Sequence, residues 1–355
     1  IAGRQIAAEK IPSWREMEEI WYPKHLSLEQ CSSEITARYK ARLSQGDSLT
    51  DLTGGFGIDC SFLATGFKSA TYVERQEELC EIAAHNFPIL NLNHINVRNE
   101  DGVAYLQTMS PVDCIFLDPA RRNEHGGKTV SIADCEPNVA ELEDLLLSKA
   151  SRIMIKLSPM LDLSLALKEL KHTQEVHILS VNNECKELLI LLGQTSPAEI
   201  TIHCVNLFTK GTQEEQHFVF TREQEQRSQC TYTDSLGDYL YEPNASLLKA
   251  GAFRSIAAAY PVRKLHPNSH LYTSDTFIEN FPGRIFRIVN QCSFNKKEVK
   301  ENLADLKKAN VTVRNFPATV AELRKRLHLT EGGDTYLFAS TLNNGQKVII
   351  RCEKV

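Results

Sequence analysis

Three glycines stand within four residues in the stretch "DLTGGFGIDC", which runs from Asp51 to Cys60. Glycine lacks a Cβ atom, so a turn that contains several glycines can bring backbone close to a ligand. The turn of Gly54, Gly55 and Gly57 lies between "SLTDL" and the apolar run "IDCSFLATGF". We expect a strand, a tight turn and a helix, with a ligand against the turn. A plain surface loop is the alternative interpretation.

The charges beside this turn restrict the kind of ligand that it can hold. A dinucleotide site has the spacing G-x-G-x-x-G and places a pyrophosphate at the helix N-terminus. This turn lacks the third glycine and carries Asp51 before the glycines and Asp59 after them. Carboxylates repel a pyrophosphate but tolerate a ligand with a positive centre, such as a sulfonium or an amine.

Acidic residues also end the next three predicted strands. Glu74 ends the strand in "TYVER", Asp101 follows "INVRN", and Asp118 ends "VDCIFLD". Ligands of a parallel sheet bind beyond the carboxyl ends of its strands, so these side chains and Asp51 form one candidate site. Glu74 can accept hydrogen bonds from a ribose diol there, and Asp101 from an exocyclic adenine amine.

Strands and helices alternate along the first two thirds of the chain, which predicts a parallel sheet covered by helices. After the fourth strand come the helix "VAELEDLLLSKA", the strand "RIMIKLS", the helix "LDLSLALKELK" and the strand "EVHILSV". The strand "KELLILLG" follows after only "NNEC", so these two strands should be antiparallel neighbours. The fold class is therefore α/β, with a Rossmann-like seven-stranded sheet whose last strand is antiparallel.

Other elements flank this sheet. The amphipathic stretch "SLEQCSSEITARYKARL" predicts a helix that begins near its first Ser, so residues 1–47 form a helical segment. "EITIHCVNLF" and "EQHFVFTRE" are two further strands, and "YEPNASLLKAGAFRSIAAAY" is a loop that leads into a helix. We expect an α/β domain over residues 48–235, with its core at 48–193, and an α+β domain over 236–355. The last domain contains the predicted helices "NKKEVKENLADLKKA" and "TVAELRKRL".

The composition argues against several classes of protein. The ten cysteines are scattered without a CxxC pair, which is typical of reduced thiols in a cytoplasmic protein. No His and Cys cluster has zinc spacing, and no apolar run reaches the roughly 18–20 residues of a membrane span. The opening "IAGRQIAAEKIPSW" has no apolar core of a signal peptide. We expect no metal and no membrane association.

Charge is distributed unevenly along the chain. Residues 283–355 contain 14 Lys and Arg against 7 Asp and Glu, a net charge of +7, whereas the whole chain carries −5. The rest of the chain therefore carries −12. This asymmetry indicates that the C-terminal segment meets an acidic partner. An ordinary mixed surface is the alternative.

Over roughly residues 48–193 the sequence resembles the class I S-adenosylmethionine-dependent methyltransferases, through "DLTGGFG", Glu74, Asp101, "DPAR" and the antiparallel last strand. The resemblance implies S-adenosyl-L-methionine as the cofactor. It implies cofactor-binding roles for Asp51, Thr53, Gly54, Gly55, Gly57, Asp59, Glu74, Arg75, Asp101, Gly102 and Asp118. Thr53 departs from the family, many of whose members have glycine at this position.

The resemblance also suggests where methyl transfer occurs. Amino-directed members of the family have Asp or Asn, two prolines and an aromatic residue after the fourth strand. This chain has Asp118, Pro119, Ala120 and Arg121, so Asp118, Pro119 and Arg121 are the implied catalytic residues. A base nitrogen is the favoured acceptor, with its N–H held by Asp118. Arg121 or Arg122 would stack on a base or hold a phosphate. A salt-bridging loop is the alternative.

The segments "YEPNASLLKAGAF", "LHPNSHLYTS" and "RNFP" resemble a THUMP-like domain found behind bacterial methyltransferases, over roughly residues 238–355. THUMP domains bind RNA, so the resemblance implies structured RNA, tRNA or rRNA, as the partner. The predicted phosphate contacts are Lys296, Lys297, Lys307, Lys308, Arg314, Arg324, Lys325 and Arg326. Methylation of a protein or small molecule, and RNA binding without catalysis, are the alternative functions.

Overall fold

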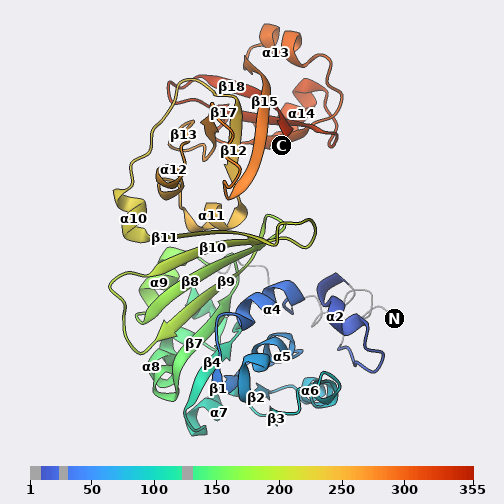
Figure 1. Ribbon diagram of the computed structural model, residues 1–355, viewed down its shortest axis with the longest axis vertical. Coiled ribbons are helices and arrows are strands. Elements are labelled where there is room, and N and C mark those ends of the chain that lie inside the picture. The colour runs from blue at the N-terminus through green and yellow to red at the C-terminus, as the bar shows by residue number, and fades with distance from the viewer. Residues whose placement is uncertain (1–8, 24–30, 122–130) are drawn as a thin grey trace. The chain divides into compact units, whose positions relative to one another are not determined.

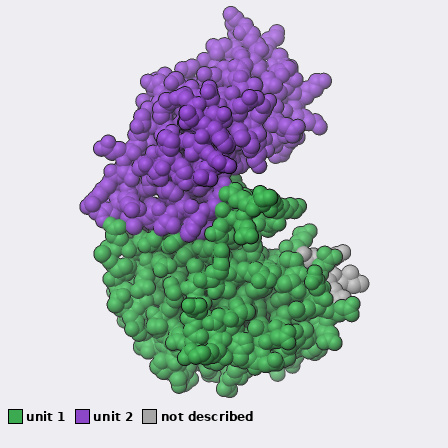
Figure 2. Space-filling view, in the orientation of Figure 1, with its two compact units in different colours: residues 1–203, 207–215 green, residues 204–206, 216–355 purple. Residues whose placement is uncertain are grey.

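The computed structural model describes residues 9–23, 31–121 and 131–355, with the side chain of residue 121 excluded. The chain forms two compact units (Figure 2). The first unit consists of Ile1–His203 and Leu207–Glu215, and the second of Cys204–Asn206 and Gln216–Val355. The first unit therefore contains the whole N-terminal segment as well as the glycine turn.

Within the described residues, nine strands form the larger sheet in the order β11-β10-β8-β9-β7-β4-β1-β2-β3 (Figure 1). Neighbours from β7 to β3 are parallel, whereas β9 is antiparallel to both β7 and β8. The prediction of a parallel sheet with an antiparallel last strand is confirmed, and two more strands extend its edge. The strands are β1 (Gly46–Asp51), β2 (Phe67–Glu74), β3 (Ile95–Asn99), β4 (Val112–Leu117), β7 (Ala150–Leu157), β8 (Thr173–Val181), β9 (Glu184–Gly193), β10 (Thr201–Leu207) and β11 (Glu215–Thr221).

Helices pack on both faces of this sheet: α4, α5 and α6 lie on one face, and α8 and α9 on the other (Figure 1). Three of the helices begin at an Asp or Asn whose side chain accepts a backbone N–H of the first turn, which satisfies an otherwise unpaired donor. The first unit's helices are α2 (Pro12–Arg15), α4 (Glu34–Ala41), α5 (Ile58–Leu63), η1 (Ala64–Gly66), α6 (Glu77–Ile89), α7 (Gly102–Thr108), η2 (Ile132–Asp134), α8 (Val139–Lys149) and α9 (Leu163–Glu169). A separate two-stranded sheet pairs β5 (Ala120–Arg121) with β6 (Cys135–Glu136).

Most residues of the central strands β4, β7 and β9 are buried, and residues 153–155 and 188–190 have no exposed surface. Strands that are covered on both faces need apolar side chains on both faces, which explains the continuous apolar runs in their sequences. Each buried aliphatic side chain stabilises the fold by about 1.5–3 kcal/mol. This core fixes the carboxyl ends of the strands, where the predicted site residues lie.

The helix predicted from Ser27 is not continuous over the described residues. Residues 24–30 lie outside the described part of the chain, and residues 31–33 are not helical, so α4 starts at Glu34. The side chain of Ser32 explains why the residues directly before α4 are not helical. Its hydroxyl contacts Lys40, Asp59 and Lys156, and these contacts hold the segment in an extended conformation.

Within the described residues, seven strands form the second unit's sheet, in the order β13-β14-β12-β15-β18-β17-β16. The segment predicted as a loop into a helix is a strand followed by two short helices, because Gly251, with φ of 75°, ends the first of them. The strands are β12 (Tyr239–Pro243), β13 (Arg263–Lys264), β14 (Tyr272–Ser274), β15 (Gly283–Ser293), β16 (Asn310–Val313), β17 (Thr335–Thr341) and β18 (Lys347–Lys354). The helices are α10 (Arg222–Arg227), α11 (Ala245–Ala250), α12 (Ser255–Ala259), α13 (Lys296–Leu303) and α14 (Val320–Leu327).

Helix α13 is shorter than predicted, so Lys307 and Lys308 are not helical. Leu306 and Ala309 pack into the core that lies under β15, β17 and β18. The backbone carbonyl of Lys307 accepts a hydrogen bond from Thr330 N at 3.0 Å. Packing of Leu306 and Ala309 into this core turns the chain out of the helix and towards β16.

A buried carboxylate joins two segments of the second unit. Glu242 on β12 is 2% exposed, accepts a hydrogen bond from Arg284 Nε at 2.9 Å and accepts another from Arg314 Nη2 at 3.0 Å. Arg314 is one of the predicted RNA contacts, and the structure gives its guanidinium this internal partner. About a third of each arginine side chain remains exposed.

We expect Glu242→Ala to destabilise the second unit by about 1–3 kcal/mol, because two guanidinium groups lose their buried acceptor. Hydrogen exchange of peptides that span β12 and β15 measures this change. Glu353→Ala is the matched control, since Glu353 pairs with Arg287 on the same sheet but both side chains are exposed. The control should change stability by less than about 0.5 kcal/mol. Equal effects of the two substitutions would contradict the prediction.

Candidate functional site

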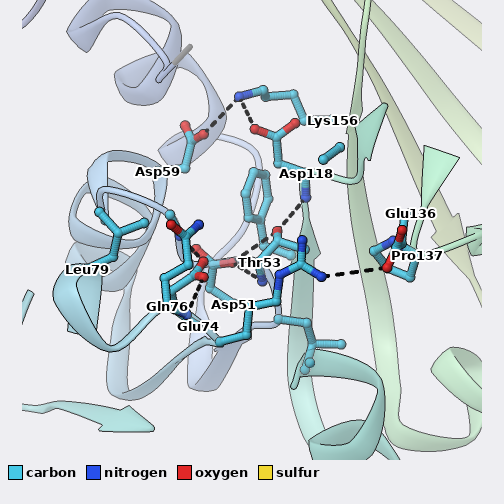
Figure 3. Close-up of a pocket in the computed structure, with 18 of the residues that line it drawn as sticks. Asp51, Thr53, Asp59, Glu74, Gln76, Leu79, Asp118, Glu136, Pro137 and Lys156 are labelled. Carbon is cyan, nitrogen blue, oxygen red and sulfur yellow. Dashed lines mark hydrogen bonds and ion pairs between the residues drawn. The ribbon is translucent and has the colours of Figure 1, made fainter. Parts of the chain in front are cut away.

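A cavity of about 500 Å³ lies at the carboxyl ends of β1, β2, β4 and β7 (Figure 3). Its lining includes the glycine turn and the acidic strand ends that the sequence singled out. The structure thus places all the predicted cofactor-binding residues around one cavity: Asp51, Thr53, Gly54, Gly55, Gly57, Asp59, Glu74, Arg75, Asp101, Gly102 and Asp118. Their roles toward a ligand remain predictions.

The glycine turn is packed directly on Tyr72 of β2. A Cβ atom on Gly54 would lie 2.2 Å from the Tyr72 ring, so no larger residue fits without moving that side chain. The Tyr72 hydroxyl donates to the carbonyl of Gly55. Gly57 has φ of 84°, a conformation that other residues rarely adopt. Packing therefore requires glycine at this turn and leaves its backbone along the cavity wall.

Thr53 connects the ends of two strands. Its backbone N–H donates to Asp51 Oδ1 at 2.9 Å, and its hydroxyl accepts from the backbone N–H of Asp118 at 2.6 Å. A glycine at this position would lack the hydroxyl. The departure from the family pattern thus gives Thr53 a structural contact that fixes Asp118 relative to β1.

Asp51 is 1% exposed. Burial raises the pKa of Asp51 to about 8, the N–H of Thr53 opposes this shift, and the carboxylates of Asp59, Asp118 and Glu74 add to it. At pH 7 the side chain is therefore mostly protonated, so it can donate as well as accept a hydrogen bond.

Backbone N–H groups hold two other acidic strand ends in place. Glu74 accepts from Gly55 N and Gln76 N, each at 2.9 Å, through different carboxylate oxygens. Asp101 caps helix α7, and its Oδ1 accepts from the first-turn N–H groups of residues 103 and 104 at 3.0 Å. A carboxylate has about four acceptor positions, so both groups retain capacity for a ligand's hydroxyl or amine donors.

Lys156 near the end of β7 lies between two of the predicted acids (Figure 3). Its Nζ is 2.5 Å from Asp118 Oδ2 and 3.4 Å from Asp59 Oδ2, and it donates to the Ser32 hydroxyl at 3.0 Å. The Lys156 side chain is only 11% exposed, whereas 36% of the Asp118 side chain is exposed. Of these two side chains, Asp118 is therefore the one that a substrate can reach more easily.

A second lysine holds the other side of Asp59. Lys40 of α4 has no exposed surface, and its Nζ lies 2.9 Å from Asp59 Oδ1. It also donates to both carboxylate oxygens of Glu187 on β9, at 2.9 and 2.7 Å. We call Glu187, Lys40, Asp59, Lys156 and Asp118, in which the charges alternate, the ion-pair network.

The network sets the protonation of its members. Burial by itself would raise the pKa of Asp59, but Lys40 and Lys156 lower it to about 2. Burial likewise opposes, but does not prevent, a rise in the pKa of Lys156, which Asp118 and Asp59 cause. Burial raises the pKa of Asp118, although Lys156 opposes that rise. Lys156 therefore stays an ammonium group, and Asp118 is the acid whose proton affinity is increased.

Lys40, Lys156 and Glu187 were not among the site residues predicted from the sequence. Lys156 and Glu187 each stand next to a run of apolar residues in a predicted strand, in "RIMIKLS" and "KELLILLG". A charged residue in a buried strand needs a partner, and this signal was available. Lys40 in "ARYKARL" carries no such signal, because lysine is ordinary on an exposed helix.

The structure describes the remaining predicted site residues only in part. Pro119 is buried, and the cavity lining among the described residues does not include it. Arg121 belongs to β5, but its side chain is not described, and Arg122 lies outside the described residues. The structure therefore does not test the substrate contacts proposed for these two arginines.

The predicted phosphate contacts of the second unit divide into two groups, those with an acidic partner inside the unit and those that are exposed. Arg314 contacts Glu242, and Arg324 lies 3.1 Å from Glu331 and is 26% exposed. The other predicted phosphate contacts are exposed: Lys296, Lys297, Lys307, Lys308, Lys325 and Arg326. The exposed lysines are thus the better candidates for contact with a polyanion.

A separate cluster contains Glu175, His177 and His203, whose ligand atoms lie within 4.8 Å of one another. The two imidazole rings are stacked, with centroids 4.3 Å apart and planes within 9°. The lone pairs of parallel stacked rings cannot converge on one ion, because each lies in its own ring plane. This geometry does not suit a metal site.

The chain is 37% identical to "putative methyltransferase from Porphyromonas gingivalis W83", whose crystal structure matches with a TM-score of 0.90. The similarity covers 99% of this chain and 88% of that chain. Residues 283–354 match the family described as THUMP domain-like, and residues 239–282 match a ferredoxin-like domain. No curated protein shows significant similarity to the chain.

Two more distant structures match less than half of the chain. A rRNA methylase from Streptococcus thermophilus is 13% identical, with a TM-score of 0.32 over 45% of this chain and 93% of that chain. A "putative methyltransferase" from Streptococcus mutans in complex with SAH is 12% identical, with a TM-score of 0.33 over 45% of this chain and 96% of that chain. Matches of this extent carry no functional conclusion. No helix among the described residues has the length and apolarity needed to cross a membrane.

The protonation of Asp51 makes a testable contribution to stability. Its native pKa of about 8 exceeds the unfolded value near 3.8, so the native state binds this proton more tightly. The stability of the native state therefore falls as pH rises from about 4 to about 8. Asn at this position does not titrate and keeps an acceptor for Thr53. We expect Asp51→Asn to raise the melting temperature much more at pH 8 than at pH 5, by roughly 2–4 °C for each kcal/mol gained.

Tryptophan fluorescence can follow this transition, because both tryptophans, Trp14 and Trp21, belong to the first unit. Asp113→Asn is a control of opposite sign. The backbone N–H groups of Ser48 and Asp47 lower the pKa of Asp113, so its carboxylate stabilises the native state above pH 4. The control should lower the melting temperature at neutral pH. An Asp51→Asn variant that is less stable than the parent at pH 8 would show that Asp51 is ionised.

Proposed function

The chain belongs to the class I methyltransferases that carry a C-terminal THUMP-like domain, and we propose that it methylates structured RNA with S-adenosyl-L-methionine as the methyl donor. One observation carries this proposal. The cavity at the strand ends combines a close-packed glycine turn with carboxyl groups from four successive strand ends. That combination disfavours phosphates and suits a nucleoside with a positive centre.

The residues around the cavity fit this cofactor in kind. Glu74 would accept from the ribose hydroxyls and Asp101 from the adenine amine, with both carboxylates already fixed by backbone N–H groups. Protonated Asp51 would donate to an acceptor of the ligand. When bound, S-adenosyl-L-methionine supplies an activated methyl group on its sulfonium. Asp118 borders the part of the cavity next to Lys156 and would contact the methyl acceptor.

The second unit supports RNA as the substrate. Its residues 283–354 match the THUMP domain-like family, and residues 283–355 carry a net charge of +7 within a chain of −5. Lys296, Lys297, Lys307 and Lys308 are exposed on this segment and can approach phosphates. These observations favour a nucleic-acid substrate over a small molecule.

The direct test uses RNA from cells that lack this protein. The purified chain is incubated with that RNA and with S-adenosylmethionine labelled in the methyl group, and nucleosides are identified by mass spectrometry. We expect label in one modified nucleoside. Label only on protein, or no transfer to tRNA or rRNA by a folded protein that binds the cofactor, would contradict an RNA substrate.

We expect Glu74→Gln to weaken binding of S-adenosylhomocysteine by roughly tenfold or more, since hydrogen bonds to a charged group contribute about 1.5–3 kcal/mol. Isothermal titration calorimetry measures the affinity. Glu77→Gln is the control, because Glu77 is exposed in the first turn of α6 and is not among the residues that line the cavity. Unchanged affinity in the Glu74 variant would refute the proposed ribose contact.

We expect replacement of Lys296, Lys297, Lys307 and Lys308 by Gln to weaken RNA binding and to flatten its salt dependence. Each lost phosphate contact on a single strand changes the slope of log K against log salt by roughly 0.7. Filter binding with tRNA over a salt series measures both quantities.

A charge-matched control separates a local effect from a change of overall charge. It replaces four exposed lysines of the first unit by Gln: Lys68, Lys168, Lys171 and Lys186. The control should reduce affinity less than the C-terminal variant. Equal losses in the two variants would show that RNA contact is not concentrated in residues 283–355.

A further inference from the structure

Three members of the ion-pair network line the cavity, namely Asp59, Lys156 and Asp118, and the carboxylate of Asp118 is the most exposed of them. Asp118 is 36% exposed, whereas the other four side chains are between 0% and 11% exposed. The ammonium of Lys156 lies 2.5 Å from Asp118 Oδ2 and therefore stands directly behind the group that meets the methyl acceptor. Glu187 and Lys40 are not among the residues that line the cavity: Glu187 pairs with Lys40, Lys40 pairs with Asp59, and Asp59 in turn pairs with Lys156.

This ammonium group affects which acceptor atom the site can stabilise. An amine nitrogen gains positive charge as it accepts a methyl group, and that charge would develop near the fixed positive charge of Lys156. A hydroxyl oxygen gains no lasting positive charge if its proton leaves during the transfer. A nearby ammonium group stabilises an oxygen that is losing its proton, because the charges are then opposite. Lys156 therefore disfavours an amine and favours a hydroxyl.

We propose that Asp118, positioned by Lys156, selects a hydroxyl oxygen as the methyl acceptor, namely the ribose 2′-hydroxyl of RNA. This inference rests on the proposed function, since it requires RNA as the substrate. Within an RNA strand the 2′-hydroxyl is the hydroxyl that each nucleotide presents. The structure thus favours a ribose oxygen over the base nitrogen predicted from the sequence.

Methyl transfer to the hydroxyl forms one bond to the methyl carbon and breaks another. The hydroxyl oxygen forms a bond to the methyl carbon while the bond from that carbon to the donor sulfur breaks, and the electron pair of the broken bond stays on sulfur. The hydroxyl proton goes to the carboxylate of Asp118 and later to solvent. No oxidant, reductant or further reactant is needed.

The assignment of the two roles follows from the charges that surround each group. Lys156 faces Asp118, Asp59 and Glu187, which raise its pKa and keep it protonated, so it cannot take the proton. The charges that act on Asp118 are those of Lys156, Asp59 and Lys40, and burial raises its pKa. Proton transfer from an alcohol is helped by a carboxylate whose pKa is raised. Asp118 is accordingly the catalytic residue and Lys156 a positioning residue.

The chemical identity of the product tests the inference separately from the proposed function. Alkali cleaves RNA through its 2′-hydroxyl, so a 2′-O-methyl group leaves an alkali-stable dinucleotide. RNA labelled by the full chain is digested with alkali, and we expect the label in dinucleotides. Label in mononucleotides would overturn the inference and leave the proposed function intact. No label in any RNA, from a chain that binds S-adenosylhomocysteine, would overturn both.

Lys156→Met tests the positioning role, because it keeps the length of the side chain and removes the charge. We expect transfer to fall by at least about 100-fold, with the affinity for S-adenosylhomocysteine by calorimetry changed by less than about threefold. Lys156→Arg should recover part of the rate. Lys168→Met is the control, since Lys168 is exposed on α9. A Lys156→Met rate within threefold of the parent would overturn the inference.

The pH dependence of transfer gives a measurement that does not require the Lys156 variant to fold. With Asp118 as the proton acceptor, the single-turnover rate should rise with pH through the raised pKa of Asp118 and then level off. Asp118→Asn should lose both the rate and this acid limb. A parent rate that is flat across the acid range would overturn the proposed role of Asp118.

Discussion

Two buried lysines make it possible for carboxylates to gather at the carboxyl end of the sheet. Without Lys40 and Lys156, Asp59, Asp118 and Glu187 would be like charges in a site of low polarity. Burying unpaired charges costs far more than most single interactions contribute, so the network depends on alternation of sign. The N-terminal segment takes part in the same arrangement, since Lys40 and Ser32 both come from it.

The acidic side chains at the cavity differ in protonation and in hydrogen-bond partners, although all of them are Asp or Glu. Asp59 sits between two lysines and stays ionised, whereas Asp51 has no lysine among the groups that shift it and is mostly protonated at neutral pH. Glu74 and Asp101 are held by backbone donors of the turn and of α7. At one end of the sheet, Asp51 is therefore a hydrogen-bond donor, Asp59 is a structural anion, and Glu74 and Asp101 are acceptors. The neighbours of each side chain cause these differences.

In the second unit, too, a buried charge needs a partner of opposite sign. This need distinguishes charged residues that hold the structure together from those that can contact a polyanion. Glu242 is buried and needs cationic partners, which Arg284 and Arg314 provide. The lysines around α13 are exposed, so their ammonium groups can approach a phosphate while they stay partly hydrated. Net charge alone therefore overstates the number of residues that can meet a polyanion.

The sequence by itself determined the alternation of strands and helices, the antiparallel last strand of the sheet and the position of the glycine turn. These features follow from local pattern: apolar runs, short connections and residues without a Cβ atom. It also determined which acids meet at the sheet edge, because Asp51, Glu74, Asp101 and Asp118 follow the carboxyl ends of successive strands and parallel strands end at the same edge. Each of these inferences needs information from only a few neighbouring residues or from the topology that they imply.

Only the tertiary structure decided the partners of those acids. Lys40 is 147 residues from Glu187 in the chain, and Lys156 is 97 residues from Asp59. No local pattern reports which side chains meet over such separations. The end of α13 and the non-helical residues directly before α4 have the same origin, since packing of Leu306 and Ala309 and the contacts of Ser32 override helical propensity. Distant packing thus fixed the charge state of the site, whereas local pattern fixed its position.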